Sequence, residues 1–431
     1  MRFRRPQRSN ATITSIMACL VLSADAVHTL ALPRENRPIR ESVEWRTLNT
    51  YQHTLTQTIF RERLKIFSPD GAIYKLMTFH EDDSVSLYQT SAKKELLWRL
   101  YFLPADTNNQ NDPALSPNRV ATYFGASWKQ PLRGLTIGID PGHIGGDWAN
   151  IEERYFRYGS HAPVKEGDLT WITAQHLATA LQLAGAEVVF TRTEGEPATS
   201  FRPDDFNYQA LEWAAEGTRY FSTRYYTFRY RWYREFLFYR VAEVVARAHR
   251  LSRQQPDFTL CIHYNAAPWS GRRPRLYNVK KLVAFVHGSY LEDELESPTQ
   301  KYELFQKLFA HVSPVEIEIA DAVTREMEAV MKMKPENYGD WAAAHRVNDN
   351  PYIWSRNVIA NRLFPGPVIF AEGAYMNDYD TFYRIQAGDY EGVRKIRGKE
   401  YPSLFREFAN AMAGGLIKHF RQKRKLAPTQ N

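Results

Sequence analysis

Cysteine is nearly missing from this chain of 431 residues, which has only Cys19 and Cys261. Cys19 falls within the first 26 residues, which have the pattern of a removable export signal, so a mature chain would keep Cys261 alone. One cysteine cannot form an intramolecular disulfide, and the fold must therefore depend on its core. Cys261 lies inside an expected strand, where we interpret it as a small buried hydrophobe and not a reactive thiol.

Long hydrophobic runs are missing as well. The longest one, residues 11–22, is shorter than the ~20 residues that a membrane-spanning helix needs, so we expect no transmembrane helix. Four arginines precede this run, and Ala24 and Ala26 follow it in the spacing of a signal-peptidase site. Residues 1–26 are thus predicted to be a signal peptide, and the mature protein to be exported, periplasmic or secreted. Lipidation at Cys19 is the alternative, and the apolar residues after that cysteine disfavour it.

The excess of positive charge is small and local. The formal charge is +8, and residues 1–26 contribute +3 through four arginines and Asp25, which leaves +5. Five basic residues near the carboxyl terminus account for that remainder: Lys418, Arg421, Lys423, Arg424 and Lys425. The body of the chain is therefore close to neutral, and residues 423–431 are predicted to be a solvated basic tail. We expect no nucleic acid partner.

The chain is long enough for more than one core. Residues 44–104 combine a possible helix near 51–64 with three strand-like segments, which predicts a small α+β domain whose role is open between wall binding and packing. The strand-like segments are residues 72–79, 84–89 and 96–103. Residues 105–116 are rich in Asp, Asn and Pro and are predicted to be the boundary of a second domain over residues 132–422.

Two histidines follow apolar strands in that second domain. The apolar alternation of residues 135–139 predicts a buried strand that stops at an Asp-Pro-Gly turn, which presents His143 at its carboxyl end. His263 follows the apolar segment 258–262 in the same way. In open α/β sheets, ligands bind beyond the carboxyl ends of the strands. Both histidines are therefore candidates for a site.

Two glutamates occupy comparable places. Glu372 follows the apolar strand predicted at residues 368–371, and Glu166 precedes an amphipathic segment that ends at Gly185. Glu166 is thus predicted to lie at the start of a helix. Two histidines and one carboxylate leave the fourth position of a tetrahedral zinc open, which is typical of a catalytic and not a structural zinc.

These four residues stand in motifs that resemble those of a known family. The motifs are DPGHIGGD at 140–147, KEGDL at 165–169, CIHYNA at 261–266 and FAEGAY at 370–375. In this order they resemble the zinc-dependent N-acetylmuramoyl-L-alanine amidases of the type 3 class. The chain departs from the family pattern by an extra Ile144 in the glycine loop and by the spacing after Glu372.

The resemblance implies an α/β catalytic domain, a mixed sheet flanked by helices. It implies zinc bound by His143, Glu166 and His263, with Glu372 as the general base that takes a proton from water and returns it to the leaving amine. The implied substrate is peptidoglycan, cleaved at the amide between the lactyl group of N-acetylmuramic acid and L-alanine.

Asp140 and Asn265 are expected to hold the loops beside the site through bonds to the backbone, as Asx residues do at turns. His161 is near Glu166 in the sequence, and we assign it no role. No serine stands in a G-x-S-x-G pattern, which disfavours a serine nucleophile. Two alternatives stay open: a zinc peptidase or amidase of the same fold with another substrate, and a non-catalytic protein that binds the cell wall.

Two insertions interrupt the motifs, at about residues 194–240 and 268–362. In the first, aromatic residues at helical spacing favour a helix buried on two sides, although its arginines and rings could instead stack on sugars or nucleic-acid bases. In the second, Ser313 to Glu316 predict a capping box that begins a helix ending at Met333. We expect one insertion to border or cover the zinc, and an activator protein acting on an insertion is a candidate partner.

Overall fold

The protein is described by a computed structural model that covers residues 43–105, 107, 125–215, 223–268 and 273–426. The predicted signal peptide and Cys19 lie outside these residues. So do most of the predicted boundary at 105–116 and residues 427–431 of the predicted tail.

A mixed sheet of eight strands forms the centre of the described fold, in the order β11-β12-β9-β13-β8-β4-β7, with β10 paired to β9. Strands β4, β7, β8 and β13 run parallel to one another, and β9 runs antiparallel to β13. The strands are β4 Thr136–Pro141, β7 Glu187–Phe190, β8 Phe258–Asn265, β9 Lys281–His287, β10 Lys334–Pro335, β11 His345–Arg346, β12 Ile353–Arg356 and β13 Val368–Tyr375.

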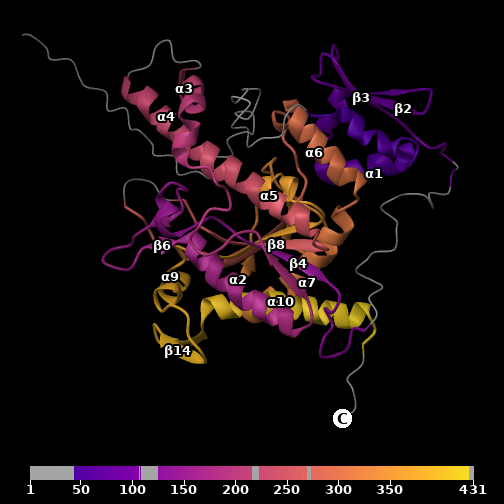
Figure 1. The fold of residues 1–431 in the computed structure, drawn as a ribbon. Coiled ribbons are helices and arrows are strands. Elements are labelled where there is room, and N and C mark those ends of the chain that lie inside the picture. The colour runs from indigo at the N-terminus through magenta and orange to yellow at the C-terminus, as the bar shows by residue number, and fades with distance from the viewer. Residues whose placement is uncertain (1–42, 106, 108–124, 216–222, 269–272, 427–431) are drawn as a thin grey trace, which may run out of the picture.

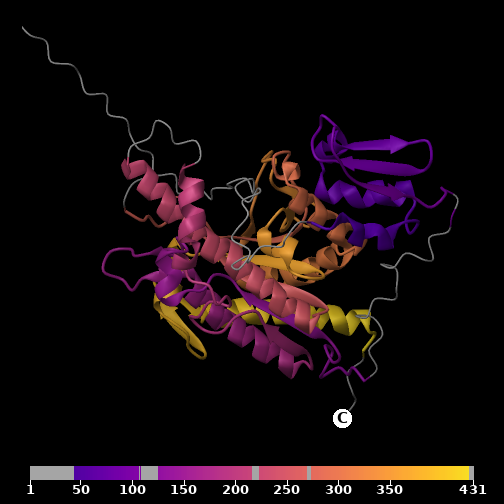
Figure 2. The same cartoon turned by 45° about the horizontal axis from the view of Figure 1, so that its top comes forward.

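Helices cover both faces of this sheet (Figures 1 and 2). Helices α2 Glu166–Leu183, α7 Ser313–Met331 and α10 Leu404–Lys423 pack with the sheet in the largest apolar core. Helices α5 Glu243–Gln254 and α8 Ile359–Leu363 pack on the other face, where Cys261 is buried. The apolar runs of β4 and β8 follow from this arrangement, because strands covered on both faces need apolar residues at every position. The predicted fold class is confirmed.

The amino-terminal region consists of a helix and a three-stranded antiparallel sheet, as predicted. Residues 72–76 form a 3-10 turn where a strand was expected, so that strand begins at Met77. The elements are η3 Trp45–Tyr51, α1 Gln57–Phe67, η4 Ala72–Leu76, β1 Met77–His80, β2 Ser84–Tyr88 and β3 Leu96–Tyr101. Their core is shared with α6 Pro298–Phe309 of the second insertion, where Phe60 stacks on Phe305. The region is therefore completed by a distant part of the chain.

The first insertion forms a helical arm that projects from the sheet layers (Figure 1). It contains η8 Pro203–Phe206, α3 Asn207–Ala215, α4 Thr223–Phe236 and the π-helical turn η9 Leu237–Ala242, which continues into α5. The prediction that its aromatic helix is buried on two sides is wrong, since Tyr225 is 42% exposed and Phe228 is 57% exposed. Helix α3 packs along α4, and η8 and η9 also contact it, but burial is complete only at its base, from Phe236 onward.

The second insertion supplies α6, α7, α8 and the strands β9 to β12. Helix α7 is present as predicted, but the capping box is not formed. Its N-cap is Val312, which makes no side-chain cap, and the helix ends at Met331 before Lys332 turns to a φ of +53°. The Glu316 carboxylate instead accepts hydrogen bonds from the backbone of two strands. Burial against the sheet thus overrides the local cap.

The remaining elements are η7 Gly146–Asn150, β5 Tyr155–Phe156, β6 Val164–Lys165, η10 Glu294–Glu296, α9 Tyr379–Gln386, β14 Val393–Ile396 and β15 Lys399–Pro402. Helix α10 extends further than predicted and includes part of the expected solvated tail. Arg424 donates to the carbonyl oxygens of Pro131 and Arg133, so this end of the chain is anchored. None of the described helices has the length and apolar character needed to cross a membrane.

Candidate metal and catalytic site

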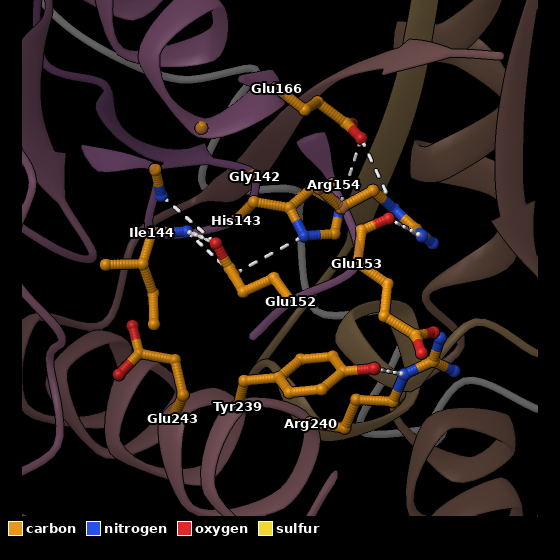
Figure 3. A network of polar contacts seen from close by, with 12 residues as sticks. Gly142, His143, Ile144, Glu152, Glu153, Arg154, Glu166, Tyr239, Arg240 and Glu243 are labelled. Carbon is orange, nitrogen blue, oxygen red and sulfur yellow. Dashed lines mark hydrogen bonds and ion pairs between the residues drawn. The ribbon is translucent and has the colours of Figure 1, made fainter. Parts of the chain in front are cut away.

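The loop after β4 holds His143 in an unusual conformation. His143 has a φ of +56°, in the left-handed region that residues other than glycine rarely adopt. The buried Glu152 carboxylate accepts from the amides of Ile144 at 2.8 Å and Gly145 at 3.0 Å (Figure 3). Arg247 donates to the His143 carbonyl oxygen at 3.0 Å. These bonds fix the backbone that directly follows His143, so its side chain is directed before any ligand binds.

Beneath this loop lies a buried ion-pair network. Asp140 accepts from the Thr191 hydroxyl at 2.5 Å and from Arg247 at 3.0 Å, and Arg247 also pairs with Glu243 at 2.7 Å. Burial favours a higher pKa for Asp140, but Arg247 and the Thr191 hydrogen bond outweigh it and the pKa is lowered. Asp140 therefore holds the loop through side chains, in place of the backbone bonds expected from the sequence. The side-chain oxygen of Asn265 does accept a backbone hydrogen bond, from the amide of the next residue, Ala266, at 2.8 Å.

Two glycines allow the site to close. A Cβ added to Gly142 would lie 2.3 Å from the His263 ring, and one added to Gly167 would lie 2.2 Å from the Gly145 nitrogen. Neither distance leaves room for a side chain. The β4 loop consequently packs directly on His263 and on the first turn of α2, which brings the two motifs together.

Glu166 is the centre of the cluster. Its carboxylate lies 3.0 Å from Nδ1 of His263 and 3.3 Å from Nε2 of His143, and it accepts from the Tyr264 amide at 3.1 Å. Arg154 approaches it at 3.4 Å (Figure 3). Burial favours a higher pKa for Glu166, but His143, His263 and Arg154 outweigh it, so the pKa lies well below its ordinary value. The group is therefore an ionised carboxylate.

The two histidine rings are fixed by their neighbours. His263 stacks on Phe370 with ring centres 4.0 Å apart, and it meets the His143 ring edge-on at 5.0 Å. Nδ1 of His143 lies 3.5 Å from Glu152, while its Nε2 faces Glu166. A carboxylate behind one ring nitrogen, with the other nitrogen directed toward a second candidate ligand, is an arrangement expected of a metal-binding histidine.

Glu372 stands opposite His263 where β13 pairs with β8. Its Oε2 atom is buried and makes no hydrogen bond to the residues that the structure describes. Burial, aided by the negative charge of Glu166 and opposed by His263, raises the pKa of Glu372 to about 7. A carboxyl group with that pKa can both take and return a proton near neutral pH.

The donor atoms fit a zinc ion. One atom from each of His143, Glu166 and His263 lies within 4.8 Å of the others. Donors at the ~2.0–2.1 Å bond lengths of tetrahedral zinc lie about 3.3 Å apart. The His143 ring lies 3.3 Å from Oε2 of Glu166 and the His263 ring lies 3.0 Å from Oε1, so both rings are close to that spacing from the carboxylate. Two imidazoles and one carboxylate are also a donor set that zinc accepts, with one position left open.

Several residues of this region carry no signal in the sequence. Glu152, Arg154 and Arg247 are ordinary charged residues in a loop and in a helix, and their sequence contexts do not mark them. These three residues come close to the site only in the folded protein. His161 lies elsewhere, with its ring against Phe382 of α9 at 5.3 Å.

The base of the first insertion reaches the His143 loop. Ile144, the extra residue of the glycine loop, is buried in a cluster with Phe206, Leu237 and Phe238. Tyr239 and Arg240 lie next to the network around His143 (Figure 3). The insertion therefore borders the site, with Ile144 and Trp148 among the residues that join it to the His143 loop.

No family model and no curated protein sequence matches this chain. Solved structures with similarity to it include the N-acetylmuramoyl-L-alanine amidase AmiC2 of Nostoc punctiforme, with 15% identity over 67% of this chain and 97% of that one and a TM-score of 0.36. Another is the N-acetylmuramyl-L-alanine amidase Ami1 of Mycobacterium smegmatis, with 13% identity, 68% and 99% coverage and a TM-score of 0.36. A third is the CwlD amidase of Clostridioides difficile in complex with the GerS lipoprotein, with 13% identity, 66% and 98% coverage and a TM-score of 0.34.

Proposed function

We propose that this protein is a zinc-dependent N-acetylmuramoyl-L-alanine amidase, a peptidoglycan hydrolase that cleaves the amide between the lactyl group of N-acetylmuramic acid and L-alanine. One observation carries the proposal. Four sequence motifs spread over residues 140–375 fold so that His143, Glu166 and His263 form one cluster, with Glu372 in register with His263. Outside that cluster, no other group of three metal-binding side chains gathers in this way among the described residues.

His143, Glu166 and His263 would hold the zinc. Bound there, the ion would supply a Lewis acid that polarises the amide carbonyl and lowers the pKa of water to roughly 7. The chain's own part is to keep these three side chains in place. Glu152 does this for His143, Phe370 for His263, and the Tyr264 amide for Glu166.

Glu372 would move the proton. Its unpartnered Oε2 atom takes the proton of the attacking water, and the same carboxyl group then returns it to the amine that leaves with L-alanine. Its raised pKa suits both steps, because a strongly acidic carboxyl would take the proton poorly. The burial that raises this pKa also limits competition from bulk water.

The proposal extends to the place of action. Hydrolysis of peptidoglycan requires export, which agrees with the signal expected in residues 1–26. An activator acting on the first insertion would reach the site through Ile144, since that residue joins the insertion's core to the His143 loop.

Digestion of purified peptidoglycan tests the function directly. The protein should release free stem peptides that begin with L-alanine, a chelator should stop the release, and added zinc should restore it. Products cut within the peptide would support a peptidase of the same fold. Binding to the wall without any product would support the non-catalytic alternative. Either of those results overturns the proposal.

A further inference from the structure

A pocket lies beyond the carboxyl end of β13, away from the four residues discussed above. It has a volume of about 560 Å³, within the ~300–1,000 Å³ typical of small-ligand sites. Its walls come from the segment before β9, the start of α9 and the hairpin β14–β15, which Figure 1 places beside α9. The charged lining residues are Lys280, Asp380, Arg397 and Lys399.

The pocket carries an excess of positive charge. Asp380 is the only acid in its lining and is already shared, because Lys280 contacts one oxygen and Arg397 donates to the other at 3.0 Å. Lys399 makes no ion pair with the residues that the structure describes and is exposed. Three cations in the lining therefore share one carboxylate, which leaves the pocket with an excess of positive charge.

The hairpin presents these cations in a fixed geometry. Ile396 pairs with Lys399, so the turn has two residues, Arg397 and Gly398, with φ values of +51° and +85°. Positive φ at both positions is the mark of a type I′ turn, which matches the twist of a hairpin. The Arg397 guanidinium also lies over the Tyr379 ring at 3.9 Å. Most side chains of the hairpin are exposed, so core packing does not account for its placement.

Backbone hydrogen bonds link the chain segment that lines the pocket to the strands that carry the candidate site. The Met376 amide donates to the carbonyl oxygen of Asn265, two residues after His263, and Tyr379 is bonded to Tyr277. Three strand residues followed by a tight turn place Tyr379 at most ~20 Å from Glu372. A peptide of six residues, fully extended, spans about 20 Å. A substrate whose peptide part has this length can thus reach from Glu372 to the pocket.

We propose that this pocket binds a carboxylate of the peptide that leaves the reaction, with Lys399 and Arg397 as its partners. The identity of the peptide rests on the proposed function, whereas the preference for an anion rests on the pocket alone. Arg397 would offer a planar guanidinium already held by Tyr379 and Asp380, and Lys399 would supply the unpaired charge. The pocket would act on specificity and not on the chemical step.

Substrate pairs test this specificity. Two soluble muramyl peptides are compared, one with free carboxylates on its peptide and one with carboxamides in their place. In Lys399→Gln, the ratio of kcat/KM for the carboxylate over the carboxamide substrate should fall about fivefold through KM, as expected for an exposed charge pair worth ~1 kcal/mol. Lys395→Gln is the matched control, because Lys395 is exposed on the same hairpin but does not line the pocket. Equal ratios in both variants and the unaltered protein would overturn the proposal.

A binding measurement makes the test independent of catalysis. Calorimetry with the full chain should show that the free peptide binds several-fold more tightly as carboxylate than as carboxamide, and that Lys399→Gln removes the difference. Inorganic phosphate binding as tightly as the peptide would overturn the assignment to a peptide carboxylate. If the peptide binds in this way but neither muramyl substrate is cut, the proposed function fails and the pocket stands. If both substrates are cut, and are bound equally tightly, the proposal for the pocket is wrong and the proposed function is still supported.

Discussion

Two buried glutamates begin helices on the sheet, and their surroundings differ completely. Glu166 at the start of α2 lies among two histidines and Arg154, beyond the carboxyl ends of β4 and β8. Glu316 in the first turn of α7 accepts from the backbone amides of His287 and Val368, at the opposite edge of the sheet. Histidines and Arg154 lower the pKa of Glu166 despite its burial, whereas burial raises that of Glu316 despite Lys307.

The difference shows how the same residue type serves binding at one edge and structure at the other. At the carboxyl ends of β4 and β8, side chains from separate loops converge on Glu166 and could bind an ion together. At the amino edge of β13, backbone amides take up both oxygens of Glu316, which leaves none for a ligand. Strand direction decides between the two, because ligand sites form at the carboxyl ends of parallel strands.

Removing the charge of Glu166 should have the largest effect on function. In Glu166→Gln the cluster loses its only anion, so both zinc and hydrolysis should be lost, by more than the ~10²–10⁴-fold typical of a missing general base. Metal content and peptidoglycan turnover measure this. His161→Ala serves as a control for histidines outside the site. Full zinc occupancy in Glu166→Gln would show that Glu166 is not a zinc ligand. The contrast between Glu166 and Glu316 would then be wrong.

Glu372→Gln should separate the base from the ligands. The amide keeps the shape but cannot take a proton, so turnover should fall ~10²–10⁴-fold. Zinc content and peptidoglycan binding should stay as in the unaltered protein. Turnover at the normal rate would exclude Glu372 as the base, and loss of zinc would make it a ligand.

Glu316→Ala should affect stability and not the site. Two buried amides lose their acceptor, at a cost of ~1–3 kcal/mol for each unsatisfied group. Urea unfolding should therefore show a lower free energy of unfolding while zinc content stays at one per chain. Glu316→Gln, which keeps an acceptor oxygen, should lose less. A Glu316→Ala variant with an unchanged free energy of unfolding but without metal would contradict this prediction. It would mean that Glu316 affects the metal site at the other end of the strands.

The smallest expected effect is a loss of stability in acid at the contact of α7 with α10. Hydrogen bonding to His419, opposed by burial and aided by Lys423, lowers the pKa of Glu318 to about 2. A carboxyl group with a lowered pKa stabilises the fold above its unfolded value of about 4.3, and this stability is lost as the pH falls toward 2. The pair is partly exposed, so it contributes ~1 kcal/mol or less. Glu318→Gln should flatten the stability profile between pH 5 and pH 2, and an unchanged profile would contradict the assignment.

Much of the site could be predicted because its residues follow strong local patterns. His143, His263 and Glu372 each come after or within apolar strands, and Glu166 begins a long helix. The supporting residues could not be predicted in the same way. Arg247 reaches the loop from α5, more than a hundred positions later in the chain, and no local pattern records that contact.

The errors have a similar origin. The aromatic spacing of α4 predicts a buried helix, but Tyr225 and Phe228 stay exposed, because periodicity does not determine how many neighbours a helix will have. The Ser313 to Glu316 pattern predicts a cap, yet the Glu316 carboxylate gains more from the buried amides of two strands than from its own helix end. In both cases a long-range contact outweighs a local preference.

Hydrophobic periodicity and turn residues act between near neighbours, so they were enough to predict β4, β8 and β13, the start of α2 and the four motif residues. Contacts between distant parts of the chain brought His143, Glu166 and His263 into one cluster, fixed the His143 loop through Glu152 and Arg247, and placed a basic hairpin beside α9 (Figure 1). These outcomes depend on strand order and on the close approach at Gly142 and Gly167. Such contacts join residues far apart in the chain, and their energies exist only once the sheet has formed.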